Sequence, residues 1–187
     1  MDDVIIISNL NDFIFCPASI YFHKLYGSED KLLYQTAYQL DGTKVHESID
    51  NCTYSTKRNI ITSLDVYSEK YRLFGKIDIY DADKKLLIER KKHVSRVFDG
   101  YVFQLYAQYY AMTEMGYGVD KLEIRSIDDN KKYPIELPDY NMHMKGCFEF
   151  LVNEMRMFNI EQFKQDNIEK CTKCIYKDAC DRSLVGD

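Results

Sequence analysis

The hydrophobic pattern of this chain changes period between its middle and its second half, and that change limits the fold more than any other feature. Ile, Leu, Val and Tyr first gather in three short runs, at residues 60–68, 72–80 and 86–92. A turn at residues 81–84 separates the last two runs, so the segment predicts a small antiparallel meander. From Asp99 to Met115 the apolar residues instead follow helical spacing, and Gly116 ends the pattern.

Further elements are expected on both sides of this meander. Ser8 is a typical N-cap for a first short helix, and Pro17 suits the first turn of a second one over 18–26, which places Cys16 between them. The other predicted elements are a helix over 35–51, strands over 121–126 and 132–137, and a helix over 141–158. No repeat or low-complexity linker divides the chain, so we predict one domain over 1–187 of α+β or mixed α/β class.

Length and composition exclude several other classes. The chain has 187 residues, 45% hydrophobic and 29% charged, which is typical of a globular domain and not of a disordered or fibrous one. The longest uncharged run, residues 100–113, is shorter than the roughly 20 apolar residues that a membrane span needs. The start Met1-Asp2-Asp3 lacks the basic region of a secretory signal, so we expect a cytoplasmic protein with reduced cysteines.

Charge is distributed unevenly along the chain. The formal net charge of −5 argues against a surface that is basic all over. Between Lys84 and Arg96, however, six Lys or Arg residues accompany a single acid, Glu89. This segment is a candidate nucleic-acid patch, and the alternative is a solvated strand end.

Two acids and a lysine on neighbouring predicted strands form the first chemical motif. Glu89 and Lys91 point to the same face of one strand, and an even-numbered turn places Asp78 opposite Glu89. Two carboxylates in contact are costly unless a cation lies between them, so the motif predicts Mg²⁺ or Mn²⁺ for phosphodiester hydrolysis. Lys91 would orient the attacking water or neutralise the charge that builds on the phosphate. A surface hairpin with cross-strand charge pairs is the alternative.

The residues around this motif favour the catalytic interpretation. The run Leu86-Leu87-Ile88 comes directly before Glu89, as in a buried strand. The following helix carries Gln104 and Gln108 one turn apart, where they suit contacts to DNA or to the attacking water. The helical His46 is a further candidate ligand, and its alternative is a packed or solvated residue. No G-x-x-x-x-G-K-[ST] loop is present, so ATP-driven chemistry is not expected.

Cysteines near the C-terminus form the second motif. Cys171, Cys174 and Cys180 have a spacing that, in a cytosolic chain, indicates a metal more often than a disulfide. Iron-sulfur clusters and structural zinc both need four ligands, and Cys16 is the leading candidate for the fourth. The spacing does not separate iron from zinc. The remaining cysteines, Cys52 and Cys147, are interpreted as small core residues.

Taken in order along the chain, these motifs resemble one known family. A cysteine between two N-terminal helices is followed by a helical His, G-x-x-D, E-x-K, a Gln-bearing helix and the three-cysteine cluster. The set resembles the RecB-type exonucleases of CRISPR adaptation, the fourth numbered Cas family. That resemblance implies a restriction-endonuclease-like PD-(D/E)XK core over 35–158 and a [4Fe-4S] cluster that joins residues 1–34 to 159–187. It also implies Mg²⁺- or Mn²⁺-dependent cutting of single-stranded DNA in a prokaryotic cytoplasm.

The resemblance assigns roles to individual residues. It makes His46, Asp78, Glu89 and the backbone carbonyl of Arg90 the metal ligands. It makes Lys91 the catalytic lysine and matches Gln104 to the glutamine of the family. The cluster ligands would be Cys16, Cys171, Cys174 and Cys180. Independently of the resemblance, Lys92 and Arg96 of the basic segment and Gln108 of the helix are the candidate DNA contacts. Related nucleases often carry Q-x-x-x-Y, but here Gln108 stands four positions after Gln104 and Tyr109 comes one later. This departure argues against a catalytic tyrosine.

Function therefore has one leading interpretation and two alternatives. The first is a metal-dependent DNA exonuclease that trims or selects fragments, with recognition of the PAM, before the CRISPR integrase inserts them as spacers. The second is a non-catalytic iron-sulfur subunit that measures or protects DNA ends in the adaptation complex. The third, a zinc-ribbon regulator, is disfavoured because cysteines from distant segments do not make a compact ribbon. The acids at Asp78 and Glu89 favour the exonuclease, because a binding module has no need of two carboxylates where phosphates approach.

Overall fold

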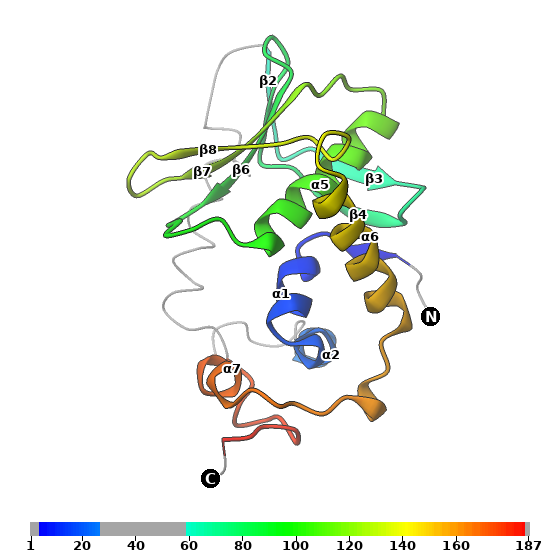
Figure 1. Ribbon diagram of the computed structural model, residues 1–187, viewed down its shortest axis with the longest axis vertical. Coiled ribbons are helices and arrows are strands. Elements are labelled where there is room, and N and C mark those ends of the chain that lie inside the picture. The colour runs from blue at the N-terminus through cyan, green and yellow to red at the C-terminus, as the bar shows by residue number, and fades with distance from the viewer. Residues whose placement is uncertain (1–3, 27–58, 186–187) are drawn as a thin grey trace.

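The computed structural model describes residues 4–26 and 59–185, and within them two mixed sheets pack with helices (Figure 1). One sheet has the strand order β2-β5-β6-β7-β8 and the other the order β1-β4-β3. The strands are β1 (Ile5–Ile6), β2 (Ile60–Thr62), β3 (Asp65–Ser68), β4 (Leu73–Lys76), β5 (Ile79–Asp81), β6 (Leu86–Lys91), β7 (Lys121–Ser126) and β8 (Lys132–Ile135). The helices are α1 (Asn9–Phe15), α2 (Pro17–Tyr26), α5 (Asp99–Glu114), α6 (Met142–Met157) and α7 (Ile168–Lys173), with a short 3₁₀ helix at Ile160–Gln162. The predicted α+β class is confirmed.

The first two predicted strands form one hairpin that bends between the two sheets. β2 pairs with β5 and β3 pairs with β4 in one continuous register. Ser63 has a φ of +53°, and there the ribbon turns, so that β4 gains β1 as a neighbour while β5 gains β6. The prediction of two unbroken strands was therefore wrong, because a positive φ at one residue redirects the ribbon. The bend places Asp78 between β4 and β5.

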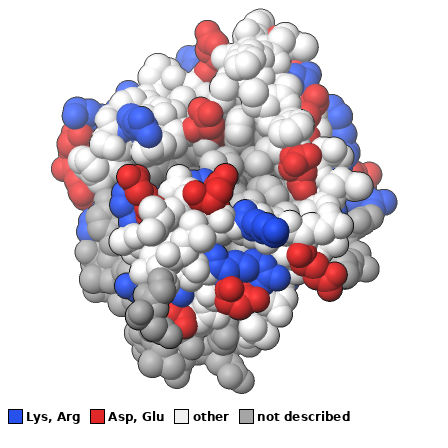
Figure 2. Space-filling model, turned by 60° about the horizontal axis from the view of Figure 1, so that its bottom comes forward, with Lys and Arg blue, Asp and Glu red and all other residues white. Residues whose placement is uncertain are grey.

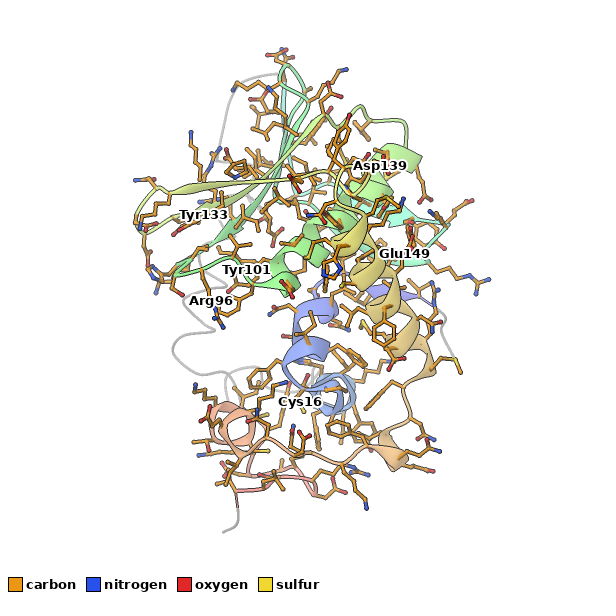
Figure 3. All side chains as sticks on the ribbon, in the orientation of Figure 1. Cys16, Arg96, Tyr101, Tyr133, Asp139 and Glu149 are labelled. Carbon is orange, nitrogen blue, oxygen red and sulfur yellow. The ribbon has the colours of Figure 1, made fainter. Side chains whose placement is uncertain are left out.

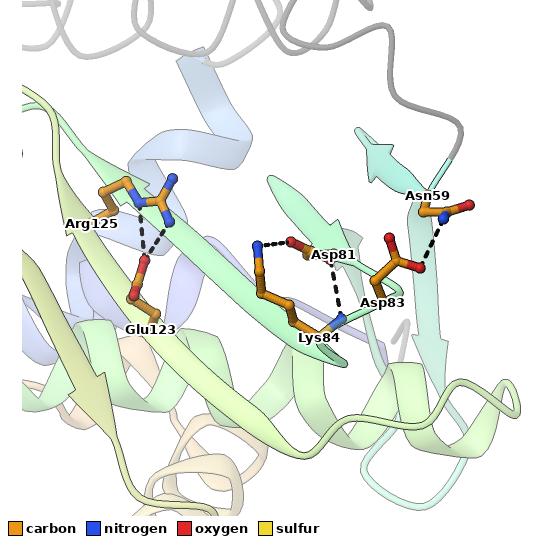
Figure 4. A network of polar contacts seen from close by, with 6 residues as sticks. All are labelled: Asn59, Asp81, Asp83, Lys84, Glu123 and Arg125. Carbon is orange, nitrogen blue, oxygen red and sulfur yellow. Dashed lines mark hydrogen bonds and ion pairs between the residues drawn. The ribbon is translucent and has the colours of Figure 1, made fainter.

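The turn between β5 and β6 sets which acids face each other. Asp81 pairs with Leu86 and Ile79 with Ile88, and continuing this register by one residue places Asp78 opposite Glu89, as predicted. The Asp81 carboxylate accepts hydrogen bonds from the backbone N–H of Lys84 at 3.2 Å and from its Nζ at 2.7 Å (Figure 4). The hydrogen bond from Lys84 lowers the pKa of Asp81 despite its burial.

Helix α5 connects the parallel strands β6 and β7 and lies at the centre of the molecule (Figure 1). Residues on all sides of it are buried, including Leu105, Tyr106 and Ala107, which are 0% exposed. The sheets, α1 and α6 all contribute to the core around it. The helix ends before Gly116, whose φ of +90° suits glycine, as the sequence predicts. An element buried on every side fixes the position of each side chain that it carries.

The N-terminal helices and the C-terminal segment pack together outside this core. Cys16 lies at the junction of α1 and α2, as predicted, although Ser8 makes no side-chain cap to α1 because its backbone is already helical. A second small core joins Ala18 and Phe22 to Tyr176 of the C-terminal segment. The predicted helix over 35–51, with His46 and the nearby Cys52, lies outside the described residues. Among the described helices, none is long and apolar enough to cross a membrane.

Candidate functional site

The acids and the lysine predicted to act together do meet at the end of β6. Glu89 is buried, with 5% of its surface exposed, and its Oε1 lies 2.8 Å from Nζ of Lys91. The lysine side chain is itself only 20% exposed. Burial by itself lowers the pKa of Lys91, but the charge and hydrogen bond of Glu89, together with the charge of Asp78, outweigh it and raise that pKa. Lys91 is therefore an ammonium at neutral pH.

Two glutamines of α5 complete this group. Gln104 Oε1 accepts a hydrogen bond from Lys91 Nζ at 2.7 Å, and Gln108 Nε2 donates to Glu89 Oε2 at 2.8 Å. Gln108 Nε2 also donates to the carbonyl of Lys76 at 3.3 Å. The two glutamines lie one helical turn apart on α5. That distance along the helix is similar to the distance between Glu89 and Lys91, which are two residues apart on β6. Gln108 is only 3% exposed, so its side chain contacts the buried Glu89 and is not at the surface, where the predicted contact with DNA would need it.

Asp78 contacts the next residue of β6. Its Oδ2 accepts a hydrogen bond from the backbone N–H of Arg90 at 2.7 Å. The N–H and C=O of one strand residue leave the same edge of the strand, so the Arg90 carbonyl is directed to the side where Asp78 lies. The pairing of β5 with β6 ends at Ile79 opposite Ile88, so Asp78 and Glu89 are the next residues along the two chains. Two carboxylates and one carbonyl therefore gather at one end of the sheet.

This donor set suits a hard cation. Carboxylate and carbonyl oxygens are the ligands that Mg²⁺ and Mn²⁺ prefer, and a carboxylate keeps lone pairs after accepting one hydrogen bond. Oε1 of the buried Gln108 also has no hydrogen-bond partner in the structure. In the part of the chain that the structure describes, no three His, Cys, Asp or Glu side chains are close enough to hold one ion. The third predicted side-chain ligand, His46, lies outside that part.

The predicted basic patch is divided among different partners. Lys84 pairs with Asp81 and Lys85 with Asp120, at 2.7 and 3.2 Å. Lys91 pairs with Glu89, whereas Arg90 contacts Asp78 through its backbone N–H. Basic and acidic side chains are also interspersed on the face shown in Figure 2. The loop after β6 carries the half-buried Lys92 and the exposed Arg96, the two other residues predicted to contact DNA.

The four cysteines predicted to act together line one cavity of about 20 Å³. They come from the α1–α2 junction, α7 and the segment after it, and Figure 3 labels Cys16 in this region. Burial raises the pKa of the Cys174 and Cys180 thiols, and the nearby cysteines raise it further. Cys16 Sγ accepts a hydrogen bond from Gln165 Nε2 at 3.3 Å. Thiols are soft donors, the ligand type that iron-sulfur clusters and zinc both take.

Cys147 stands apart from this cavity, as predicted. It lies on α6, packs against the main core and has its Sγ 3.9 Å from His143 Nε2. The sequence had no signal for the contacts that close the cavity. Lys170 Nζ of α7 donates to the Ile14 carbonyl of α1 at 3.1 Å, and the rings of Phe22 and Tyr176 stack with centroids 5.6 Å apart. These contacts join segments more than 150 residues apart in the sequence.

Comparison with known proteins supports the fold. No family model matches this chain, and no curated protein matches its sequence. The crystal structure of SSO0001 is similar, with a TM-score of 0.62 at 16% sequence identity. The match covers 98% of this chain and 88% of that one. At this identity the likeness concerns the fold alone, over nearly the whole length of both chains.

Proposed function

We propose that this protein is a metal-dependent exonuclease that cuts single-stranded DNA. The observation that carries the proposal is the meeting of Asp78, Glu89 and Lys91 at one end of a sheet, with the lysine ion-paired and poorly exposed. A buried acid–lysine pair costs desolvation energy and is weak as a source of stability. Placed beside two further oxygen donors, it suits phosphoryl chemistry better than a structural role.

The residues of the site divide the work of hydrolysis. Asp78, Glu89 and the Arg90 carbonyl would hold Mg²⁺ or Mn²⁺, with His46 as the further ligand that the family resemblance implies. When bound, such an ion polarises a phosphoryl oxygen and makes water a better nucleophile. Lys91, kept protonated by Glu89, lies where it can donate to a phosphate oxygen or orient the attacking water. Gln104 directs the ammonium through its 2.7 Å hydrogen bond.

The cysteine cavity is proposed to hold a [4Fe-4S] cluster. Such a cluster takes one thiolate per iron, so its four ligands surround a volume. A single zinc ion draws four sulfurs to about 2.3 Å from one point. The four thiols here line one shared cavity and come from both the N-terminal helices and the C-terminal segment. The family resemblance selects the cluster over zinc, and a cluster here would join the N-terminal helices to α7.

A wider role follows from the family resemblance alone. We propose that the enzyme trims or selects DNA fragments for insertion as CRISPR spacers and works with the CRISPR integrase. The second candidate is a non-catalytic DNA-end-binding subunit with the same cluster. It is favoured by one observation: both oxygens of Glu89 already have partners within the protein.

One experiment separates these two functions. The holoprotein is incubated with Mn²⁺ and end-labelled single-stranded DNA, and the products are resolved by length. We expect progressive shortening by the wild type and by Asp65→Ala, an exposed acid on β3, and none by Asp78→Ala. DNA binding without shortening in the wild type would establish the second candidate. Equal cleavage by wild type and Asp78→Ala would remove the active-site assignment.

A further inference from the structure

Two aromatic rings in contact lie between Lys91 and the surface, and the outer one is exposed. Lys91 Nζ lies 4.9 Å from the ring centroid of Tyr101, and the Tyr101 and Phe98 rings meet edge to face at 5.5 Å. The Arg96 guanidinium lies 4.5 Å from the centroid of the Phe98 ring. Phe98 is nevertheless 38% exposed, and Arg96 is exposed as well. We call Arg96, Phe98 and Tyr101 the aromatic platform.

The loop that carries this platform is anchored on both sides. Val94 is buried, its N–H donates to Ser126 Oγ at 3.2 Å, and its carbonyl accepts from Tyr133 Oη at 2.9 Å. Phe98 directly precedes α5, whose position the core fixes. Figure 3 shows Arg96 and Tyr101 on the same side of the molecule as Tyr133 of β8. The exposed ring therefore stands on a short segment tied down at both ends.

The composition of the platform indicates its ligand. A ring with a guanidinium over it is a surface on which nucleobases stack, because every base has a π-face and Arg adds a cation–π contribution. Phosphate capture alone would not need Phe98, and the exposed carboxylate of Asp99 beside it opposes a purely anionic ligand. The flat, neutral base of a nucleotide satisfies both observations.

We infer that the aromatic platform stacks an unpaired nucleobase of the DNA strand whose phosphate lies at Lys91. The inference rests on the proposed nuclease function and names the residues that would recognise an unpaired base. A base in a duplex is covered by its neighbours, whereas an unpaired base at a strand end offers a free face. Phe98 would then make the site selective for single strands over duplex ends.

The test uses 2-aminopurine, a base whose fluorescence falls when it stacks. A single-stranded oligonucleotide with 2-aminopurine near its end is titrated with the holoprotein in EDTA, so that no cleavage occurs. Wild-type protein should quench the signal, and Phe98→Leu, which keeps the apolar bulk but loses the ring, should bind roughly 5- to 100-fold more weakly. Phe98→Tyr should restore both. The matched control is Phe74→Leu, a ring of β4 with similar exposure (42%) near the other end of α5.

Cleavage assays with Mn²⁺ then distinguish the stacking role of the platform from the proposed nuclease function. Phe98→Leu should raise KM for single strands with little change in kcat and reduce the preference for single strands over the same sequence annealed to its complement. If the wild type cleaves single strands and Phe98→Leu matches it in quenching, KM and preference, the platform is refuted while the nuclease stands. If the wild type neither quenches nor cleaves, both inferences are refuted.

Discussion

The cluster of hydrogen-bonded side chains around Glu89, called the carboxylate group below, and the cysteine cavity differ in what holds their side chains in place. Glu89, Lys91, Gln104 and Gln108 hydrogen-bond one another, and they stand on a β-strand and a buried helix. The cavity is instead lined by thiols from short helices and loops at the two ends of the chain. Its walls are joined by a few contacts such as that of Lys170 with Ile14.

The difference indicates where each site obtains its stability. Hydrogen bonds and ion pairs within the protein preorganise the carboxylate group, so it needs no ligand to keep its shape. Thiols make weak hydrogen bonds, and the proposed cluster, bound to four of them, would supply folding energy to the segments that carry them. Loss of the cluster should therefore loosen the chain ends and leave the sheet intact.

The largest expected effect is on catalysis, through Lys91. Lys91→Met keeps the length of the side chain and removes its charge, so cleavage of single-stranded DNA should fall by at least roughly 100-fold, while DNA affinity changes little. Initial rates and binding are measured with Mn²⁺ and in EDTA respectively. Lys121→Met, on an exposed lysine of β7, serves as the control. Unchanged turnover in Lys91→Met would mean that the group is structural.

The same variant tests preorganisation through stability. Removal of Lys91 leaves the Glu89 carboxylate buried without its counter-ion, which should cost up to roughly 3 kcal/mol, reduced from a fully buried pair because Lys91 is 20% exposed. The double variant Glu89→Gln with Lys91→Met should recover most of this loss but no activity. Urea unfolding gives the three free energies. No recovery in the double variant would refute the account of an unpaired charge.

The cysteine cavity should respond as a unit to loss of one ligand. Anaerobically purified protein should be brown and contain about four irons, whereas Cys16→Ala should lose both iron and solubility. Cys147→Ala, on α6, should keep the colour. Hydrogen exchange on chelator-treated protein should show lost protection in α2 and α7 but not in α5 or β6. A colourless wild type with one zinc would refute the iron assignment, and full iron content in Cys16→Ala would refute the ligand set.

The glutamines should have intermediate effects. Gln108→Met removes the hydrogen bond to Glu89 Oε2 and keeps the packing volume. The poorer positioning of Glu89 should raise the activation free energy by about 1.4 kcal/mol, which corresponds to a 10-fold slower rate. Gln104→Met should act similarly through Lys91. Iron content should stay at the wild-type level in both variants. Rates equal to wild type would show that α5 does not orient the site.

The smallest effects are expected on the surface. Neutralising Lys92 and Arg96 together should reduce the slope of the logarithm of the DNA-binding constant against the logarithm of salt concentration. The reduction should be about one to two, as expected for the loss of one to two phosphate contacts, and kcat should not change. Binding is measured at several salt concentrations, with the exposed Lys121 and Lys132 neutralised as a matched pair. The same slope in both double variants would place the DNA path elsewhere.

Asp81 provides a pH-dependent prediction for the turn that sets the register. Its pKa is lowered by Lys84, so its contribution to stability is complete above the unfolded pKa of about 3.9 and is lost as the pH falls through the folded value. Asp81→Asn should therefore be slightly less stable than wild type at neutral pH, and the two should converge in acid. Asp128→Asn, at an exposed turn, is the control. If the difference in unfolding free energy between wild type and Asp81→Asn stays constant across this pH range, the Asp81–Lys84 pair is excluded as the source of that difference.

Much of this molecule is determined by local sequence. The extent of α5 follows from apolar spacing and from Gly116 at its end, and the β5–β6 register that leads to Asp78 and Glu89 follows from strand alternation and the length of one turn. Such features depend on residues a few positions apart, whose geometry the backbone itself restricts.

Only the tertiary structure decided the partners of these residues. The sequence did not indicate that Ser63 would bend the hairpin between two sheets, that Gln108 would bond the buried Glu89, or that Lys85 would pair with Asp120. Each of these outcomes depends on which segments pack together across long stretches of chain. The energy of such contacts comes from burial and desolvation, which a linear pattern of residues does not specify.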